Sequence, residues 1–217
     1  MNHHEHHHRQ PAGSEGIDVP LSVWPVWSQS DLVGRLVQQF TAPDEIVTLL
    51  GVEGVAPVTD LGRHCIAYCT LEAMAREYEA ITRSGQTEGI GYVLSIEDDN
   101  LDLPEHLRTR TTSVLTICDD RGWDASTWWA LAESIPAWGL LAVLWDGPAI
   151  SAMARSSCAG SGLSYAGHIV AAESSAFDRA AATAAGLAQV KAGEPRRSHT
   201  NVGLWARYPG RIDGSSL

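Results

Sequence analysis

Short apolar runs recur along the chain, and polar or amphipathic stretches separate them. The predicted strands are Ile46–Leu50, Arg63–Cys69, Gly89–Ile96, Thr111–Cys118, Leu140–Trp145, Tyr165–Ala172 and His199–Arg207. Most of these runs are continuously apolar rather than alternating, which is typical of strands that are buried on both faces. The pattern therefore predicts an α/β protein with a mainly parallel, seven-stranded sheet and helices on both faces.

Apolar residues at helical spacing lie between several of these strands. The segments with this spacing are Leu71–Ile81, Asp124–Ile135 and Pro148–Ala159, and the Ala-rich segment Phe177–Pro195 fits either a helix or a loop. In the first helix the apolar face is predicted to consist of Leu71, Met74, Ala75, Tyr78 and Ile81. Asp124 or Ser126 is expected to cap the second helix, because both side chains accept hydrogen bonds from the first turn.

The two ends of the chain differ in composition from the rest. Residues 1–20 are rich in histidine and include glycine, proline and serine, so we expect a disordered tail. The histidines of Asn2–His8 could chelate a divalent metal, but no spacing defines a coordination geometry, and no metal site is predicted. We expect one folded domain over residues 21–209 and a short tail at 210–217.

Composition and charge narrow the class of protein. With 44% hydrophobic and 19% charged residues, the 217-residue chain is expected to fold around a substantial core. Its formal charge of -11 argues against a surface devoted to phosphate backbones. No apolar run has the length of a membrane span, so no membrane contact is expected. Four scattered cysteines favour reduced thiols and a cytoplasmic location over a disulfide scaffold.

The eight tryptophans fall into two groups according to their positions in the predicted elements. Core packing between helices and sheet is expected for Trp128, Trp138 and Trp145. A place beside loops at the carboxyl edge of the sheet, or on the N-terminal arm, is expected for Trp24, Trp27 and Trp123. Ligands of such folds bind at that edge, where these rings could stack on a base or be buried in an interface.

Three stretches resemble the class I S-adenosyl-L-methionine (AdoMet)-dependent methyltransferases. They are "LGRHCIAYCTLEAMAREYEA", "WWALAESIPAWGLLAVLWDG" and "LSYAGHIVAAES…HTNVGLWAR". They are similar to the second strand and helix, the helix and fifth strand, and the closing strand pair. The branch with the greatest similarity contains DNA amino-methylases and tRNA guanosine methylases. This resemblance implies a Rossmann-like fold with an antiparallel last strand, AdoMet as cofactor and a nucleic acid as partner.

The resemblance also implies where the cofactor would bind. In the family, a G-x-G loop after the first strand lets the backbone approach the methionine part of AdoMet. Here "LLGVEGVAP" gives Gly51, Glu53 and Gly54 as the cofactor-binding residues. An acidic residue at the end of the second strand should hold the ribose. The matching positions carry no charge, and Glu72 is the nearest carboxylate. Loss of one such pair weakens affinity by about ten- to a hundredfold.

The expected catalytic motif is Asp/Asn/Ser-Pro-Pro-Tyr at the end of the fourth strand, and "TICDDRGW" stands there instead. Asp119 and Asp120 supply carboxylates that could act as a general base or orient an amine, and Trp123 could stack on a substrate. The same residues also fit an acidic loop that caps a helix.

Two hypotheses follow from the altered motifs. In the first, the chain is a diverged AdoMet-dependent methyltransferase-like protein that acts on nucleic acid. In the second, it is a pseudoenzyme, a non-catalytic protein that uses the same scaffold to bind or assemble with a protein partner.

Overall fold

The computed structural model describes residues 21–84, 89–98, 101–110, 113–174 and 199–209. The predicted tails at 1–20 and 210–217, and the segment Phe177–Pro195, lie outside the described residues.

The described residues form one sheet of eight strands. These are β1 (Leu21–Val26), β2 (Ile46–Leu50), β3 (His64–Cys69), β4 (Gly91–Ser95), β5 (Leu115–Asp119), β6 (Leu140–Trp145), β7 (Ser164–Glu173) and β8 (His199–Ala206). Their order in the sheet is β1-β7-β8-β6-β5-β2-β3-β4. β8 is antiparallel to both of its neighbours, and every other pair is parallel. The predicted fold class is confirmed, with one strand more than the seven expected.

The additional strand is β1, which lies at one edge of the sheet and pairs with β7. Val26 is buried and belongs to the hydrophobic core, and Trp24 packs against that core. Leu21 and Val23 point away and are 66% and 55% exposed. Pro25 is tolerated because an edge strand leaves one row of backbone groups without a partner strand.

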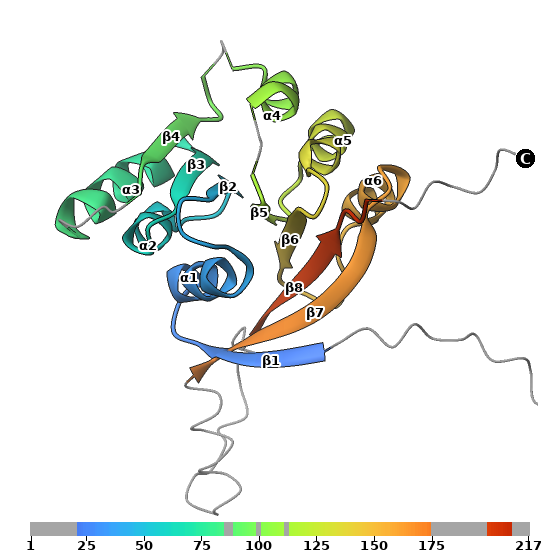
Figure 1. The fold of residues 1–217 in the computed structure, drawn as a ribbon, viewed down its shortest axis with the longest axis horizontal. Coiled ribbons are helices and arrows are strands. Elements are labelled where there is room, and N and C mark those ends of the chain that lie inside the picture. The colour runs from blue at the N-terminus through green and yellow to red at the C-terminus, as the bar shows by residue number, and fades with distance from the viewer. Residues whose placement is uncertain (1–20, 85–88, 99–100, 111–112, 175–198, 210–217) are drawn as a thin grey trace, which may run out of the picture.

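Six helices cover the two faces of the sheet in the described part of the chain. They are α1 (Gln29–Phe40), α2 (Val55–Asp60), α3 (Leu71–Ser84), α4 (Leu103–Arg110), α5 (Ala125–Ser134) and α6 (Ala152–Gly160). Helices α1–α3 lie on one face and α4–α6 on the other (Figure 1). Each face has its own hydrophobic cluster, one with α1 and α2 and the other with α5 and α6. The predicted N-cap is confirmed, since Asp124 accepts a hydrogen bond from Thr127 N.

The apolar face predicted for α3 is correct in part, because Met74 and Ile81 pack against the core. Leu71 and Tyr78 are 54% and 51% exposed, whereas Ala73 and Glu77 are buried. The helix is turned so that the Glu77 carboxylate reaches the start of α2. An apolar-periodicity argument treats glutamate as a surface residue, so the predicted face is displaced from the buried one toward Leu71 and Tyr78.

The core assignment of the tryptophans holds in part. Trp128 is 1% exposed, which confirms the prediction for that residue. Trp138 is 72% exposed and is not a core residue. It lies in the turn between α5 and β6 with a φ of 66°, and its ring meets that of Tyr208 edge-on. A turn in this conformation places the ring on the surface, whatever its hydrophobicity.

The parallel strands end at one edge of the sheet, and the loops that follow them meet there. Leu50 at the end of β2 pairs with Cys118 of β5, and Asp119 pairs with Leu144 of β6. Antiparallel β8 begins at this edge. Separately, none of the helices in the described ranges has the length and apolarity needed to cross a membrane.

Candidate functional site

The glycine loop, Gly51–Gly54, joins β2 to α2. Gly51 has a φ of +69°, and its N–H donates to the carbonyl of Tyr68 at 2.8 Å. A Cβ atom at Gly51 would lie 2.5 Å from Asp119 Oδ1 and 3.0 Å from the Trp123 ring. Glycine is therefore needed here because the chain's own carboxylate and indole lie against the loop backbone.

The end of the glycine loop is bound by a buried carboxylate from α3. Gly54 N–H donates to Glu77 Oε1 at 2.5 Å, and Val55 N–H donates to Glu77 Oε2 at 3.0 Å. Glu77 is only 4% exposed. Burial raises the pKa of the Glu77 carboxyl, and the two amide donors act against that rise. Both oxygens thus bind backbone groups at the start of α2.

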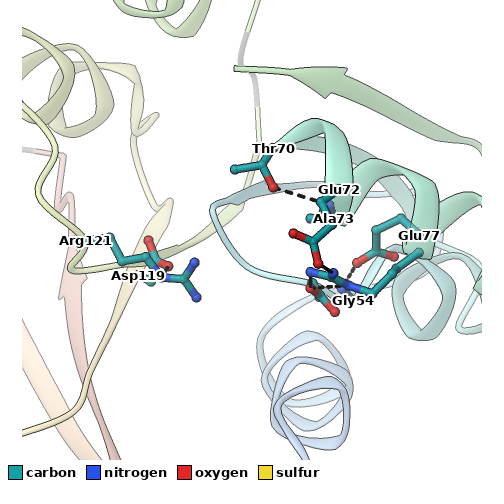
Figure 2. Close-up of polar contacts among 9 residues, drawn as sticks. Gly54, Thr70, Glu72, Ala73, Glu77, Asp119 and Arg121 are labelled. Carbon is teal, nitrogen blue, oxygen red and sulfur yellow. Dashed lines mark hydrogen bonds and ion pairs between the residues drawn. The ribbon is translucent and has the colours of Figure 1, made fainter. Parts of the chain in front are cut away.

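Two predicted cofactor residues, Glu53 and Glu72, meet at one arginine. Arg76 Nε donates to Glu53 Oε1 at 3.0 Å, and Arg76 Nη1 donates to Glu72 Oε1 at 2.5 Å. All three side chains are well exposed, Glu72 most of all at 85%. Figure 2 shows Glu72 and Glu77 projecting from the same helix beside Gly54. The structure brings Gly51, Glu53, Gly54 and Glu72 into one region, and their role toward a cofactor stays a prediction.

The end of β3 carries no carboxylate. Cys69 is buried, and burial is the main cause that raises the pKa of its thiol to about 11. Thr70 Oγ1 accepts a hydrogen bond from Ala73 N at 3.3 Å and so caps α3 (Figure 2). Glu97, after β4, accepts from Leu71 N at 3.2 Å. The nearby polar groups therefore hold the start of the helix.

Asp119 is the last residue of β5 and is only 6% exposed. It forms an ion pair with Arg121, and this pair lies apart from the cluster around Gly54 and Glu77 (Figure 2). The Trp123 indole N–H donates to the Asp119 carbonyl at 2.9 Å, which holds the ring over the loop. Burial raises the pKa of the Asp119 carboxyl to about 6, although Arg121 lowers it. Such a group changes protonation near neutral pH.

The neighbouring Asp120 has a different environment. Its N–H donates to the Leu144 carbonyl at 2.8 Å, and its Oδ2 accepts from Ser151 N at 2.6 Å. Ser151 in turn caps α6, because its hydroxyl accepts from Ala154 N at 3.1 Å. Asp120 therefore anchors the loop between β6 and α6.

A half-open cavity of about 710 Å³ lies at the carboxyl edge, between the ends of β5 and β6 and those of β7 and β1. We call it the acidic cavity. Its lining is Val26, Trp27, Ser28, Gln29, Leu32, Asp119, Asp120, Arg121, Leu144, Trp145, Asp146, Ala149, Ala171, Glu173, His199 and Thr200. The lining includes both predicted catalytic carboxylates, and it contains no residue of the glycine loop.

Several residues of these two regions were not predicted from sequence. They are Glu77 and Arg76 at the glycine loop, and Asp146, Glu173 and His199 at the cavity. A signal existed for Asp146 and Glu173, because each lies at the end of a predicted strand, where ligands of parallel sheets bind. No local signal marks Glu77. Among the described residues, no group of three or more histidine, cysteine or acidic side chains could hold a metal ion.

Comparison with known proteins gives a uniform result for the fold. No family model and no curated protein sequence matches the chain. Solved structures do match. Precorrin-6y C5,15-methyltransferase from Geobacter metallireducens has a TM-score of 0.55 at 10% identity, over 84% of this chain and 93% of that one. TrmN from Thermus thermophilus has a TM-score of 0.54 at 13% identity, over 82% and 48%.

A third structure contains a bound nucleoside. The SAM-dependent methyltransferase from Geobacter sulfurreducens, in complex with S-adenosyl-L-homocysteine, has a TM-score of 0.50 at 12% identity, over 83% of this chain and 90% of that one. Identities this low show the fold and leave substrate and activity open. The sheet order, the antiparallel β8 and these matches together show that the chain has the fold of the SAM-dependent methyltransferases.

Proposed function

We propose that this chain is a non-catalytic binding protein built on a methyltransferase fold. One observation carries the proposal: side chains of this chain contact the backbone of the glycine loop, where a cofactor would have to bind. Asp119 and Trp123 lie against Gly51, and Glu77 takes the amides of Gly54 and Val55.

The residues present do not fit AdoMet in the position that the family resemblance implies. The cofactor needs direct contact with the loop backbone. At Gly51 even a group the size of a Cβ atom would meet Asp119, so the space beside the backbone is already filled. Its ribose needs a carboxylate at the end of β3, where Thr70 caps a helix instead. The two nearest carboxylates, Glu53 and Glu72, are engaged by Arg76. Each missing contact lowers affinity, and the losses act together.

The second candidate is methyl transfer to a nucleic acid, and Asp119 favours it. This carboxyl ends β5, lines the acidic cavity and has a pKa raised by burial to about 6, which suits a general base near neutral pH. The acidic lining of the cavity disfavours a phosphate backbone. The two candidates differ in one requirement, because methyl transfer needs AdoMet and the binding protein does not.

Calorimetric titration with AdoMet and with S-adenosyl-L-homocysteine (AdoHcy) separates the candidates. We expect no saturable heat at millimolar concentrations of either ligand. Micromolar binding would contradict the proposal and restore the methyltransferase candidate. Asp119→Asn should then abolish methyl transfer to DNA or tRNA acceptors.

A pair of variants tests whether the glycine loop is blocked by Trp123. Trp123→Ala removes the ring that lies 3.0 Å from a Cβ at Gly51, so we expect weak AdoHcy binding to appear. Trp138→Ala removes an equally large ring that is 72% exposed, and should leave the protein without AdoHcy affinity.

A further inference from the structure

The acidic cavity has a composition of its own, separate from the glycine loop. Its floor is apolar, because four buried hydrophobic residues of one core cluster line it. These are Val26, Leu32, Leu144 and Ala171. A floor of this kind binds the apolar body of a ligand by removing its surface from water.

Above this floor the charged groups are mostly acidic. Carboxylates line the cavity at Asp119, Asp120, Asp146 and Glu173. Arg121 is the single lysine or arginine in the described lining, and His199 is the one imidazole. The lining is therefore net negative at neutral pH, in a chain whose formal charge is -11. Such a potential concentrates cations and excludes phosphates.

Asp119 makes this cavity different from an ordinary acidic surface. It is 94% buried, and among the residues that the structure describes the one charged partner of its carboxylate is Arg121. Its ion-pair partner Arg121 has a side chain that is 73% exposed and can swing into solvent when another cation enters. A buried carboxylate needs a cationic partner, and a ligand cation could take the place of this exposed arginine.

Two indole rings add a second type of cation contact. Trp27 is 75% exposed at the mouth of the cavity, and Trp145 lies on its wall. The Trp145 indole nitrogen is buried and has no hydrogen-bond partner in the described part of the chain. Tryptophan faces attract ammonium and guanidinium groups, most strongly where water is excluded.

We propose that the acidic cavity binds an organic cation, a ligand with an ammonium or guanidinium group on an apolar stem. The charged group pairs with Asp119 and displaces Arg121, while the stem lies on the apolar floor beside the indole rings. This inference rests on the proposed function and deepens it by naming the class of ligand. A volume of about 710 Å³ exceeds a simple ammonium ion and accommodates a diamine, a guanidine or a basic side chain.

Calorimetry on the full chain tests the inference and distinguishes two sources of the same chemistry. One arm uses the free guanidine agmatine, and the other uses a capped Gly-Arg-Gly tripeptide. The matched probe is 4-guanidinobutanoate, whose added carboxylate would face the acidic lining. We expect agmatine or the tripeptide to bind at least tenfold more tightly than this anion-bearing probe. If neither binds at millimolar concentration, the inference is overturned.

Variants assign the binding to the cavity. Asp119→Asn keeps the shape of the side chain and should weaken binding about tenfold. Glu79→Gln makes the same charge change on α3, where the side chain is exposed, and should alter affinity less than twofold. Trp27→Ala removes an exposed ring without threatening the fold and should weaken binding several-fold. Unchanged affinity in Asp119→Asn and Trp27→Ala would overturn the inference.

AdoHcy keeps this outcome separate from that of the proposed function. It has a neutral thioether in place of the sulfonium, and its one ammonium group stands beside a carboxylate, which the acidic lining disfavours, so its binding reports a nucleoside site. Saturable AdoHcy binding would contradict the non-catalytic proposal whether or not agmatine binds. Loss of agmatine binding alone would overturn only the cation inference.

Discussion

The glycine loop and the acidic cavity lie at the same edge of the sheet, yet they use carboxylates in opposite ways. At the glycine loop, Glu77 is buried and both oxygens accept backbone N–H groups. At the cavity, Asp119 is buried to a similar degree, and its carboxylate is paired with the exposed side chain of Arg121. One carboxylate binds the backbone of its own chain, and the other is paired with an exposed arginine.

This contrast shows where to look for function in a fold whose familiar motif has changed. A loop whose donors are satisfied within the chain gains stability and loses its capacity for a ligand. A buried charge whose partner is an exposed arginine costs stability, and such costs are typical of functional sites.

The largest expected effect on stability comes from adding a side chain to the glycine loop at Gly51. In Gly51→Ala, the new methyl group would lie 2.5 Å from Asp119 Oδ1 in a backbone conformation with φ +69°. We expect the free energy of unfolding to fall by about 3–4 kcal/mol, measured by urea denaturation. Gly122→Ala is the control, because Gly122 also has a positive φ but open space around it, and its loss should be about 1 kcal/mol. Equal losses would show that Asp119 and Trp123 do not close the loop.

The second effect is a pH dependence of stability caused by Asp119. Its pKa in the folded protein, about 6, lies above the ordinary value, so the folded state binds this proton more tightly than the unfolded state. The resulting stabilisation is complete below about pH 4 and is lost as pH rises through 6, by on the order of 2–3 kcal/mol.

The contributions of other ionisable groups around Asp119 to the pH dependence of stability must be subtracted. These groups are Asp120 and Arg121 in its own loop and Asp146, Glu173 and His199 across the acidic cavity. Urea midpoints of the wild type and Asp119→Asn, compared from pH 4.5 to 8, remove their shared contribution. Parallel curves would contradict the assignment of the raised pKa to Asp119.

Removing the carboxylate at the glycine loop should have a somewhat smaller effect. Glu77→Ala leaves the amides of Gly54 and Val55 buried without their acceptors, but it also removes a desolvated charge. We expect a net loss of about 2 kcal/mol in thermal or urea unfolding. Glu72→Ala on the same helix is the control, because its carboxylate is 85% exposed and should matter little. Similar losses in both variants would remove the special role of Glu77.

The smallest effect is expected for the arginine that joins two predicted cofactor residues. Arg76→Met breaks the ion pairs with Glu53 and Glu72, which are all exposed to solvent. We expect a change within about 0.5 kcal/mol in urea unfolding, and a smaller one at high salt. A loss several times larger would mean that this arginine organises the glycine loop.

The sequence predicted the sheet better than it predicted the site. Continuous apolar runs identified β2 and β6 with their correct bounds, because strands buried on both faces need no partner information to be recognised. Helix α2 has only six residues and contains Pro57, so it offers no periodic pattern. Strand β1 was missed because Pro25 interrupts it.

The candidate site, like the fold, was predicted from the sequence only in part. Strand ends marked Asp119 and Asp120 as residues of the carboxyl edge, and both line the cavity. Whether a carboxylate there is bound by its own chain depends on donors from distant segments. Glu77 and Gly54 are 23 residues apart, and Asp120 and Ser151 are 31 apart. No local pattern contains such pairings, so the difference between Asp119 and Asp120 emerged only with the structure.

The pairing of β1 with β7 constrains the order in which the parts of this protein can fold. Leu21 pairs with His168, so β1 cannot pair until the chain has been synthesised through β7. Closing so long a loop is slow, and it follows the local contacts among β2, β3 and their helices. Val26 and Trp27, which line the acidic cavity, are positioned by this late step. The glycine loop can therefore form on a nascent chain, whereas the cavity is assembled only after β7 has been synthesised.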